Sequence, residues 1–256
     1  MRTLQLVLQY DGARFAGWQR QPDERTVQGL LEDAMQRLCE THIAVLGAGR
    51  TDAGVHALGQ AAGVIVPQKW TAHTLRRALN AILPRDVRIT AVHEMDPQFH
   101  ARYSAISRSY RYLVGTDEDA ESPFRAGREL AYRRPLDVTV LNKLASLLPG
   151  DHCFRGFAVK GTAPEADDHR CIVTRAEWVQ RSGGLAFEIR ANRFLHHMVR
   201  FLVGTMLDVA SGRRDIDVIT RLLEAQDNHE VSAPAPPYGL YLEKVEYPRE
   251  LYLVNA

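Results

Sequence analysis

Cysteine, long apolar runs and lysine are all scarce in this sequence. The three cysteines, Cys39, Cys153 and Cys171, are odd in number and widely spaced, which is typical of a reducing compartment rather than of a disulfide framework. No apolar run approaches the length of a membrane span. Residues 1–12 alternate apolar and polar side chains as a strand does, unlike a signal peptide. We therefore expect a folded cytoplasmic protein with small cysteine side chains in its core.

The charges nearly balance, and a net charge of +1 does not by itself indicate a nucleic-acid partner. The basic residues are almost all arginines, because the only lysines are Lys69, Lys143, Lys160 and Lys244. The planar guanidinium group suits phosphates and base edges better than an ammonium group does. A bias in genome composition would produce the same excess, so both explanations stay open.

Hydrophobic periodicity divides the chain into two similar series of strands and helices. The first series is strand, helix, strand, helix and strand, at residues 3–10, 27–38, 61–68, 72–82 and 86–95. The second has a strand at 107–115, a helix at 137–150, a hairpin at 171–194, helices at 196–210 and 215–226, and a strand at 239–248. This order favours an α+β fold of two split βαβ units, which we place at residues 1–104 and 105–256.

The segment GAGRTDAGVHALGQ, at residues 47–60, has the most unusual composition. Gly49 and Gly54 have the spacing of a phosphate-binding loop, but Val55 and His56 stand where that motif needs Lys and Ser or Thr. The glycines at 47 and 49 match only the first half of a dinucleotide fingerprint. The simplest structural interpretation is a glycine-rich turn in which Asp52 caps the backbone.

Two features of this segment favour a chemical role for Asp52. Arg50 is two residues away, so both side chains can lie on one side of an extended backbone, where the cation would keep the carboxylate ionised. The neighbouring side chains are small and leave space above the carboxylate: Ala48, Ala53, Gly54 and Ala57. A nucleophile or general base requires an ionised and uncrowded aspartate of this kind.

Sequence motifs for metal binding and for serine hydrolases are missing. His196 and His197 are adjacent on a predicted helix, where their side chains would point about 100° apart and would not share an ion. The chain has no H-E-x-x-H, H-x-H or C-x-x-C motif and no G-x-S-x-G nucleophile elbow. We therefore expect no metal site and no catalytic triad.

The segment FHARYSAISRSYRYLVG, at residues 99–115, interleaves aromatic residues with three arginines and contains no acid. Alternation along a strand would place Arg108, Tyr110 and Tyr112 on one face. Arginines that follow phosphates and aromatic rings that stack on bases suit structured or single-stranded RNA. The alternative is an ordinary strand with one polar face, and we favour the RNA-binding interpretation.

Several segments occur in the order found in the tRNA pseudouridine synthase A family: YDGARFAGWQRQ, GRTDAGVHA, FHARY, RSYRYLV, NRFLHHMVRFLVG and APPYGLYLEKVEY. The chain resembles this family over essentially its whole length. The resemblance implies two ferredoxin-like halves joined into one mixed, mainly antiparallel sheet, flanked by helices, with a central active-site cleft. It also implies a homodimer without cofactor or metal that converts uridine to pseudouridine at positions 38, 39 and 40 of the tRNA anticodon stem-loop.

The same resemblance implies roles for individual residues. Asp52 corresponds to the catalytic aspartate, and Arg50 is the arginine of its motif. Tyr110 corresponds to the residue that stacks on the target uracil and takes its C5 proton, and Arg200 to the arginine that pairs with the aspartate. The implied RNA contacts are Phe99, His100, Ala101, Arg102 and Tyr103, together with Phe157, Ala158, Val159, Lys160 and Gly161.

The implied reaction breaks the bond between ribose C1′ and uracil N1, turns the base and rejoins it through C5. It consumes neither an oxidant nor water, which agrees with the missing cofactor and metal motifs. A carboxylate either attacks the sugar or takes a proton from it, and both routes stay open. Two alternatives remain: a non-catalytic module that binds structured RNA on the same fold, and a metal-dependent nuclease or deaminase, which the missing ligand motifs disfavour.

Overall fold

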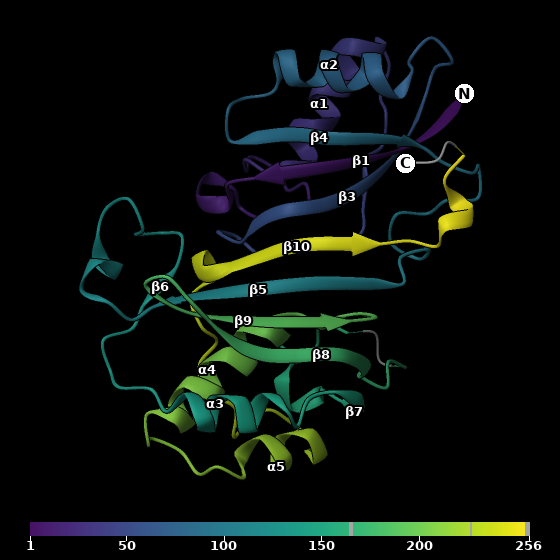
Figure 1. The fold of residues 1–256 in the computed structure, drawn as a ribbon. Coiled ribbons are helices and arrows are strands. Elements are labelled where there is room, and N and C mark those ends of the chain that lie inside the picture. Colours follow the sequence, from purple (N-terminus) through teal and green to yellow (C-terminus); the bar gives the residue numbers. More distant parts are fainter. Residues whose placement is uncertain (164–165, 226, 254–256) are drawn as a thin grey trace. The chain divides into compact units, whose positions relative to one another are not determined.

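The computed structural model describes residues 1–163, 166–225 and 227–253 and has an α+β fold (Figure 1). Its chain divides into two compact units. Unit 1 contains Met1–Ser107 and the chain from Tyr241 onward, and unit 2 contains Arg108–Leu240. The first division therefore lies three residues after the boundary that we predicted, and the last strand groups with unit 1. The end of the predicted second half, residues 254–256, lies outside the described residues.

Unit 1 has the strand order of a ferredoxin-like fold. Its elements are β1 (Arg2–Tyr10), α1 (Val27–Cys39), β2 (Leu46–Gly47), β3 (His56–Val66), α2 (Ala72–Ile82), β4 (Val87–Glu94) and β10 (Leu240–Glu246). β1 pairs antiparallel with both β3 and β4, and the short β2 pairs antiparallel with β3. β10 pairs parallel with the start of β3. This sheet is mixed and mainly antiparallel, as predicted.

Local sequence signals in unit 1 are confirmed at the level of side chains. Leu4, Leu6 and Leu8 alternate along β1 and are fully buried. Thr26 accepts a hydrogen bond from the Gly29 amide at the start of α1. Thr71 forms a reciprocal capping box with the residue three positions later at the start of α2. The two helices lie together beside the sheet of unit 1 (Figure 1).

Unit 2 contains a split βαβ arrangement. Its elements are β5 (Ser107–Gly115), β6 (Leu130–Ala131), α3 (Val138–Ala145), β7 (Gly150–Cys153), β8 (Arg170–Arg181), β9 (Gly184–Ala191), α4 (Met198–Ala210) and α5 (Val218–Glu224). β9 pairs antiparallel with both β5 and β8, so the two strands on either side of it run parallel to each other. β7 extends this sheet antiparallel to β8, and β6 pairs parallel with β5.

The predicted hairpin in unit 2 is confirmed, because residues 182–183 join β8 to β9. Gly183 has φ +78°, and a Cβ atom on Gly184 would lie 2.0 Å from the Val114 carbonyl oxygen. Behind the sheet, α4 is buried along most of its length. The indole N–H of Trp178 donates to the Met206 sulfur over 3.4 Å. Within the described ranges, no helix combines the length and apolar character that a membrane crossing requires.

The three cysteines are free thiols in three environments. Cys39 and Cys171 are buried as predicted, whereas Cys153 is only half-buried. Burial raises the pKa of Cys171 to about 12 and also raises the pKa of Cys39. Neither buried thiol therefore forms much thiolate at neutral pH.

We predict that a thiol-alkylating reagent modifies only Cys153 in the native protein at about pH 8, because the thiolate is the reactive form and burial disfavours it. Cys39 and Cys171 should react only after unfolding, and peptide mass spectrometry measures all three. If Cys171 reacted in the native protein as fast as Cys153, the burial of β8 would be contradicted.

Candidate active site

Asp52 lies in unit 1 on the loop of residues 48–55 that joins β2 to β3. Its side chain is half-buried, between the buried Thr51 and the exposed Ala53. The amide of Val55 donates to the Asp52 carbonyl over 3.1 Å, which closes a turn, and Gly54 supplies the left-handed φ of +79° that this turn needs. The glycine-rich turn of the simpler interpretation is present, and Asp52 contributes its backbone carbonyl to it.

Three buried contacts hold the backbone of this loop from the side of β1. The hydroxyl groups of Tyr10 and Thr51 are 2.8 Å apart. The Trp18 amide donates to the Thr51 carbonyl over 3.0 Å, and the Gln60 side-chain amide donates to the Gly49 carbonyl over 3.0 Å. Burial raises the pKa of Tyr10 to about 12, so its phenol keeps its proton and its hydrogen bonds. The residues on both sides of Arg50 are thereby fixed.

The glycines around the loop mainly permit close packing within the protein. A Cβ atom on Gly12 would lie 2.1 Å from the Val55 carbonyl oxygen, and one on Gly47 would lie 2.5 Å from the indole of Trp18. Gly17 has φ +101°, and its Cβ would lie 2.8 Å from the Thr51 carbonyl oxygen. At Gly49, in contrast, the added position is open, with nothing within 4 Å. Gly12, Gly17 and Gly47 therefore permit close packing, whereas Gly49 leaves open space.

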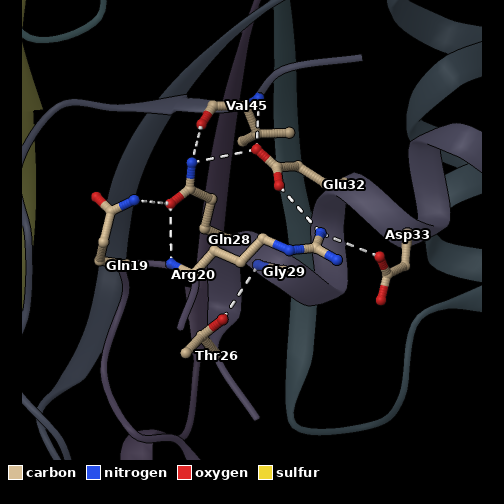
Figure 2. Close-up of polar contacts among 8 residues, drawn as sticks. All are labelled: Gln19, Arg20, Thr26, Gln28, Gly29, Glu32, Asp33 and Val45. Atoms are coloured by element: carbon tan, nitrogen blue, oxygen red, sulfur yellow. Dashed lines mark hydrogen bonds and ion pairs between the residues drawn. The ribbon is translucent and has the colours of Figure 1, made fainter. Parts of the chain in front are cut away.

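A polar network on α1 ties together the two segments that flank the loop (Figure 2). The side-chain oxygen of Gln28 accepts from the Gln19 side chain over 2.6 Å and from the Arg20 backbone amide over 3.0 Å. The Gln28 side-chain amide group donates to Glu32 and to the Val45 backbone carbonyl, each over 3.1 Å. Glu32 is buried and also pairs with Arg20 over 3.1 Å. Sequence analysis missed this network; its one signal is a pair of polar residues four apart on the buried side of a helix.

The expected pairing of Arg50 with Asp52 is not found. Arg50 is exposed, and in the described part of the chain it forms no hydrogen bond or ion pair with Asp52. The expectation assumed an extended backbone, whereas the chain turns at residues 52–55 and only Thr51 is held inward. Arg50 is thus an exposed cation next to the loop rather than a local partner of the carboxylate.

The predicted RNA-contacting segment 99–103 divides between core and surface of unit 1. Phe99 and Ala101 are buried, and the Tyr247 hydroxyl donates to the Ala101 carbonyl over 2.6 Å. The Tyr103 side chain is 78% exposed, and the Arg102 guanidinium lies over its ring at 5.7 Å from the centroid. His100 is half-buried, and its Nδ1 accepts from the backbone amides of Arg102 and Tyr103. His100, Arg102 and Tyr103 are therefore the members available to a ligand.

Tyr110 lies on β5 in unit 2 with an exposed fraction of 9%. Its ring meets the Phe194 ring edge to face, with centroids 4.9 Å apart. The predicted aromatic and basic binding face is wrong at Tyr112, which is fully buried and donates its hydroxyl to the Pro236 carbonyl over 2.9 Å. Arg108 donates to the Asn192 carbonyl over 2.7 Å. Along this face Tyr112 packs in the core, whereas Arg108 is half-buried and Tyr110 keeps a small exposed fraction.

Arg200 lies on α4 and is held against the loop that follows α5. Its Nε donates to the Ala235 carbonyl over 2.7 Å, and the Ala235 amide donates to the Arg200 carbonyl over 2.9 Å. The helix begins at Met198 and not at residue 196, because His197 adopts a left-handed conformation with φ +62°. The His196 and His197 rings consequently lie only 4.1 Å apart, so our argument that they point in separate directions is wrong.

The second predicted RNA-contacting segment, residues 157–161, also divides between core and surface of unit 2. Phe157 and Ala158 are buried. The Val159 amide donates to the His196 carbonyl over 3.3 Å, which connects this segment to the residues preceding α4. Lys160 and Gly161 are exposed, and Gly161 has φ +76°. Only the end of the segment presents a cation to solvent.

Comparison with known proteins gives concordant matches. A family model described as tRNA pseudouridine synthase matches residues 6–104 and 144–248. The chain is 43% identical over 251 residues to tRNA pseudouridine synthase A of Chloroflexus aurantiacus, covering 97% of this chain and 90% of that one. It is 39% identical over 249 residues to the Chlorobium luteolum protein of the same name, covering 97% and 96%. The Porphyromonas gingivalis protein of that name is 38% identical over 252 residues, covering 97% and 98%.

We predict that Gly17→Ala lowers the free energy of unfolding by about 1–3 kcal/mol, because the new side chain meets a strained backbone angle and the Thr51 carbonyl. Gly49→Ala is the matched control, since its added methyl group meets open space. Urea unfolding followed by circular dichroism measures both variants. Equal losses would show that the approach of Gly17 to Thr51 does not constrain the loop.

Proposed function

The chain belongs to the tRNA pseudouridine synthase family, and from this premise we propose that it isomerises uridine to pseudouridine in tRNA. The proposed targets are positions 38, 39 and 40 of the anticodon stem-loop. The observation that supports this most is the placement of Asp52, half-buried on a loop whose neighbouring backbone is held by Tyr10, Trp18 and Gln60. A reacting carboxylate needs such a fixed position, because small displacements reduce the rate strongly.

In the proposed reaction, Asp52 acts on the ribose of the target uridine. Either its carboxylate attacks C1′, or it removes a proton from the sugar; in both cases the electron pair of the C1′–N1 bond leaves with the base. The freed uracil turns and its C5 bonds to C1′; on the first route this displaces the Asp52 carboxylate from C1′, and on the second Asp52 returns its proton to the sugar. C5 then loses its proton while N1 gains one. Atoms and electrons balance without an external reactant, so the chain's own acids and bases suffice.

We propose that Tyr110 stacks on the uracil and removes the C5 proton. Packing of its ring against Phe194 supports this role, because it restricts the ring to one orientation. Arg200 is the proposed partner of the Asp52 carboxylate, and the contacts with Ala235 would fix its guanidinium. For Arg50 we propose a contact with the tRNA backbone, since it is exposed and does not pair with Asp52.

We further propose that residues 1–104 and 105–256 act as the two halves of one enzyme, as a cytoplasmic homodimer without metal or cofactor. His100, Arg102, Tyr103, Lys160 and Gly161 are the RNA contacts that their exposure supports best. Phe99, Ala101, Phe157 and Ala158 are buried, so we propose that they shape these segments from within. Val159, half-buried between them, keeps its proposed contact.

We predict that Asp52→Asn abolishes pseudouridine formation on an anticodon stem-loop tRNA while tRNA binding persists, because the amide can neither attack the sugar nor take its proton. Asp23→Asn, at an exposed aspartate elsewhere in unit 1, should keep the wild-type rate. Turnover by Asp52→Asn near the wild-type rate would refute the assignment. Full activity in EDTA would distinguish this enzyme from the metal-dependent alternative.

We predict that Tyr110→Phe lowers turnover by roughly 10²–10⁴-fold, the usual contribution of a general base, with little change in tRNA affinity. Tyr112→Phe is the control, since it removes a phenol two residues along the same strand that bonds to Pro236. Single-turnover assays and filter binding separate the two effects. An unchanged rate in Tyr110→Phe would assign the C5 proton to another group.

A further inference from the structure

A pocket of about 420 Å³ lies between α2 and β4 in unit 1, outside the elements that hold Asp52. Its lining includes three arginines, Arg76, Arg77 and Arg88, together with Asn80 and Thr90. All three arginine side chains are exposed. The arrangement is therefore an open, cationic pocket of a size suited to part of a polyanion.

The local sequence explains why these arginines converge. Leu75 and Leu79 of α2 are fully buried, so Arg76 and Asn80, one turn apart, and Arg77 beside them face away from the core. On β4 the period of two buries residue 89 and places Arg88 and Thr90 on the same side. The Thr90 hydroxyl donates to the Val7 carbonyl over 3.1 Å and is thus turned to β1, so the pocket takes its polar lining from the arginines and Asn80.

Two of these side chains close the outer edge of β4. The Asn80 amide donates to the Ile89 carbonyl over 2.8 Å, and its carbonyl accepts from the Ile89 amide over 2.9 Å. Arg76 donates to the Thr90 carbonyl over 3.2 Å. These side chains of α2 bond to backbone groups of β4 that an additional strand would otherwise pair with. The same bonds fix the position of α2 relative to β4 at the pocket.

The pocket lacks an acidic counterpart. Throughout the described ranges, no carboxylate forms an ion pair with Arg76, Arg77 or Arg88. The acids that border β4 are already paired: Asp86 with Arg25 at 3.0 Å, and Glu94 with Arg2. Three arginines that line one pocket without an acidic partner make it cationic, and their planar guanidinium groups suit phosphate oxygens.

The register of the sheet places this pocket at the same end of unit 1 as the Asp52 loop. Tyr10 pairs with Ala57, near the start of β3, and also with Val87, the first residue of β4. β3 follows the Asp52 loop directly, and β4 is two strands away, about 10 Å at the usual strand spacing. One RNA molecule can therefore reach both places.

We propose that the pocket formed by Arg76, Arg77 and Arg88 binds backbone phosphates of the same tRNA whose uridine is modified. This inference rests on the proposed function for its choice of RNA. The pocket reads no base, because guanidinium contacts to phosphates carry no sequence information. It adds affinity and holds the substrate while the chemistry occurs elsewhere in the protein.

The test is the tRNA affinity of Arg77→Ala, Arg88→Ala and the double variant, measured by filter binding across a salt series. We expect each single variant to raise Kd by about three- to tenfold and to reduce the slope of log K against log salt by roughly 0.7–0.9. The rate at saturating tRNA should stay at the wild-type value. Arg77→Lys and Arg88→Lys should retain most of the salt slope because they keep the charge.

Arg37→Ala is the matched control, since it removes an exposed helical arginine that does not line the pocket. An unchanged Kd and salt slope in the double variant would overturn the proposal. If that variant also self-associated in size-exclusion chromatography, the arginines would be assigned to protecting the edge of β4. The binding readout needs no turnover, so its failure is distinguishable from a failure of the proposed isomerase activity.

Discussion

The Asp52 loop depends on the buried contact between Thr51 and the segment that follows β1. The Thr51 hydroxyl shares a hydrogen bond with the Tyr10 hydroxyl, and the Thr51 carbonyl accepts from the Trp18 amide. Gly17 permits the close approach of the two backbones here, since a Cβ atom on it would lie 2.8 Å from the Thr51 carbonyl oxygen. With Thr51 held inward, the carboxylate next to it stays at the surface. The motif around Asp52 and the earlier motif YDGARFAGW are therefore one structural unit, although Gly47 comes 29 positions after Trp18 in the sequence.

The network on α1 supports the same unit from further away. Burying the Glu32 carboxylate is unfavourable in isolation, and here Arg20, Gln28 and the Val45 amide all bond to it. Each partner lies on a segment that leads toward Trp18 or Gly47. A group that would destabilise the core if unpaired instead fixes the geometry of the candidate site. Polar networks of this kind define one arrangement because every partner must be present.

The arginines fall into two classes, which explains why net charge was uninformative. One class stabilises the fold through ion pairs, such as Arg25 with Asp86 and Arg193 with Asp167, where the hydrogen bond from Arg193 lowers the pKa of the carboxyl. The other class, including Arg77 and Arg88, has no acidic partner among the described residues. The net charge counts all acids and bases together. It therefore does not show which arginines have an acidic partner and which do not. An arginine therefore indicates RNA binding only where the tertiary structure gives it no acidic partner.

The sequence alone determined the features that depend on neighbours along the chain: the alternation of Leu4, Leu6 and Leu8, the caps at Thr26 and Thr71, and the hairpin at residues 182–183. It also determined the family, because the motifs are long and their order is specific. Tertiary structure decided the features that depend on distant partners. It buried Tyr112, brought the rings of His196 and His197 together, and separated Arg50 from Asp52. Local periodicity states which side chains share a face, but only packing decides whether that face meets the core or the solvent.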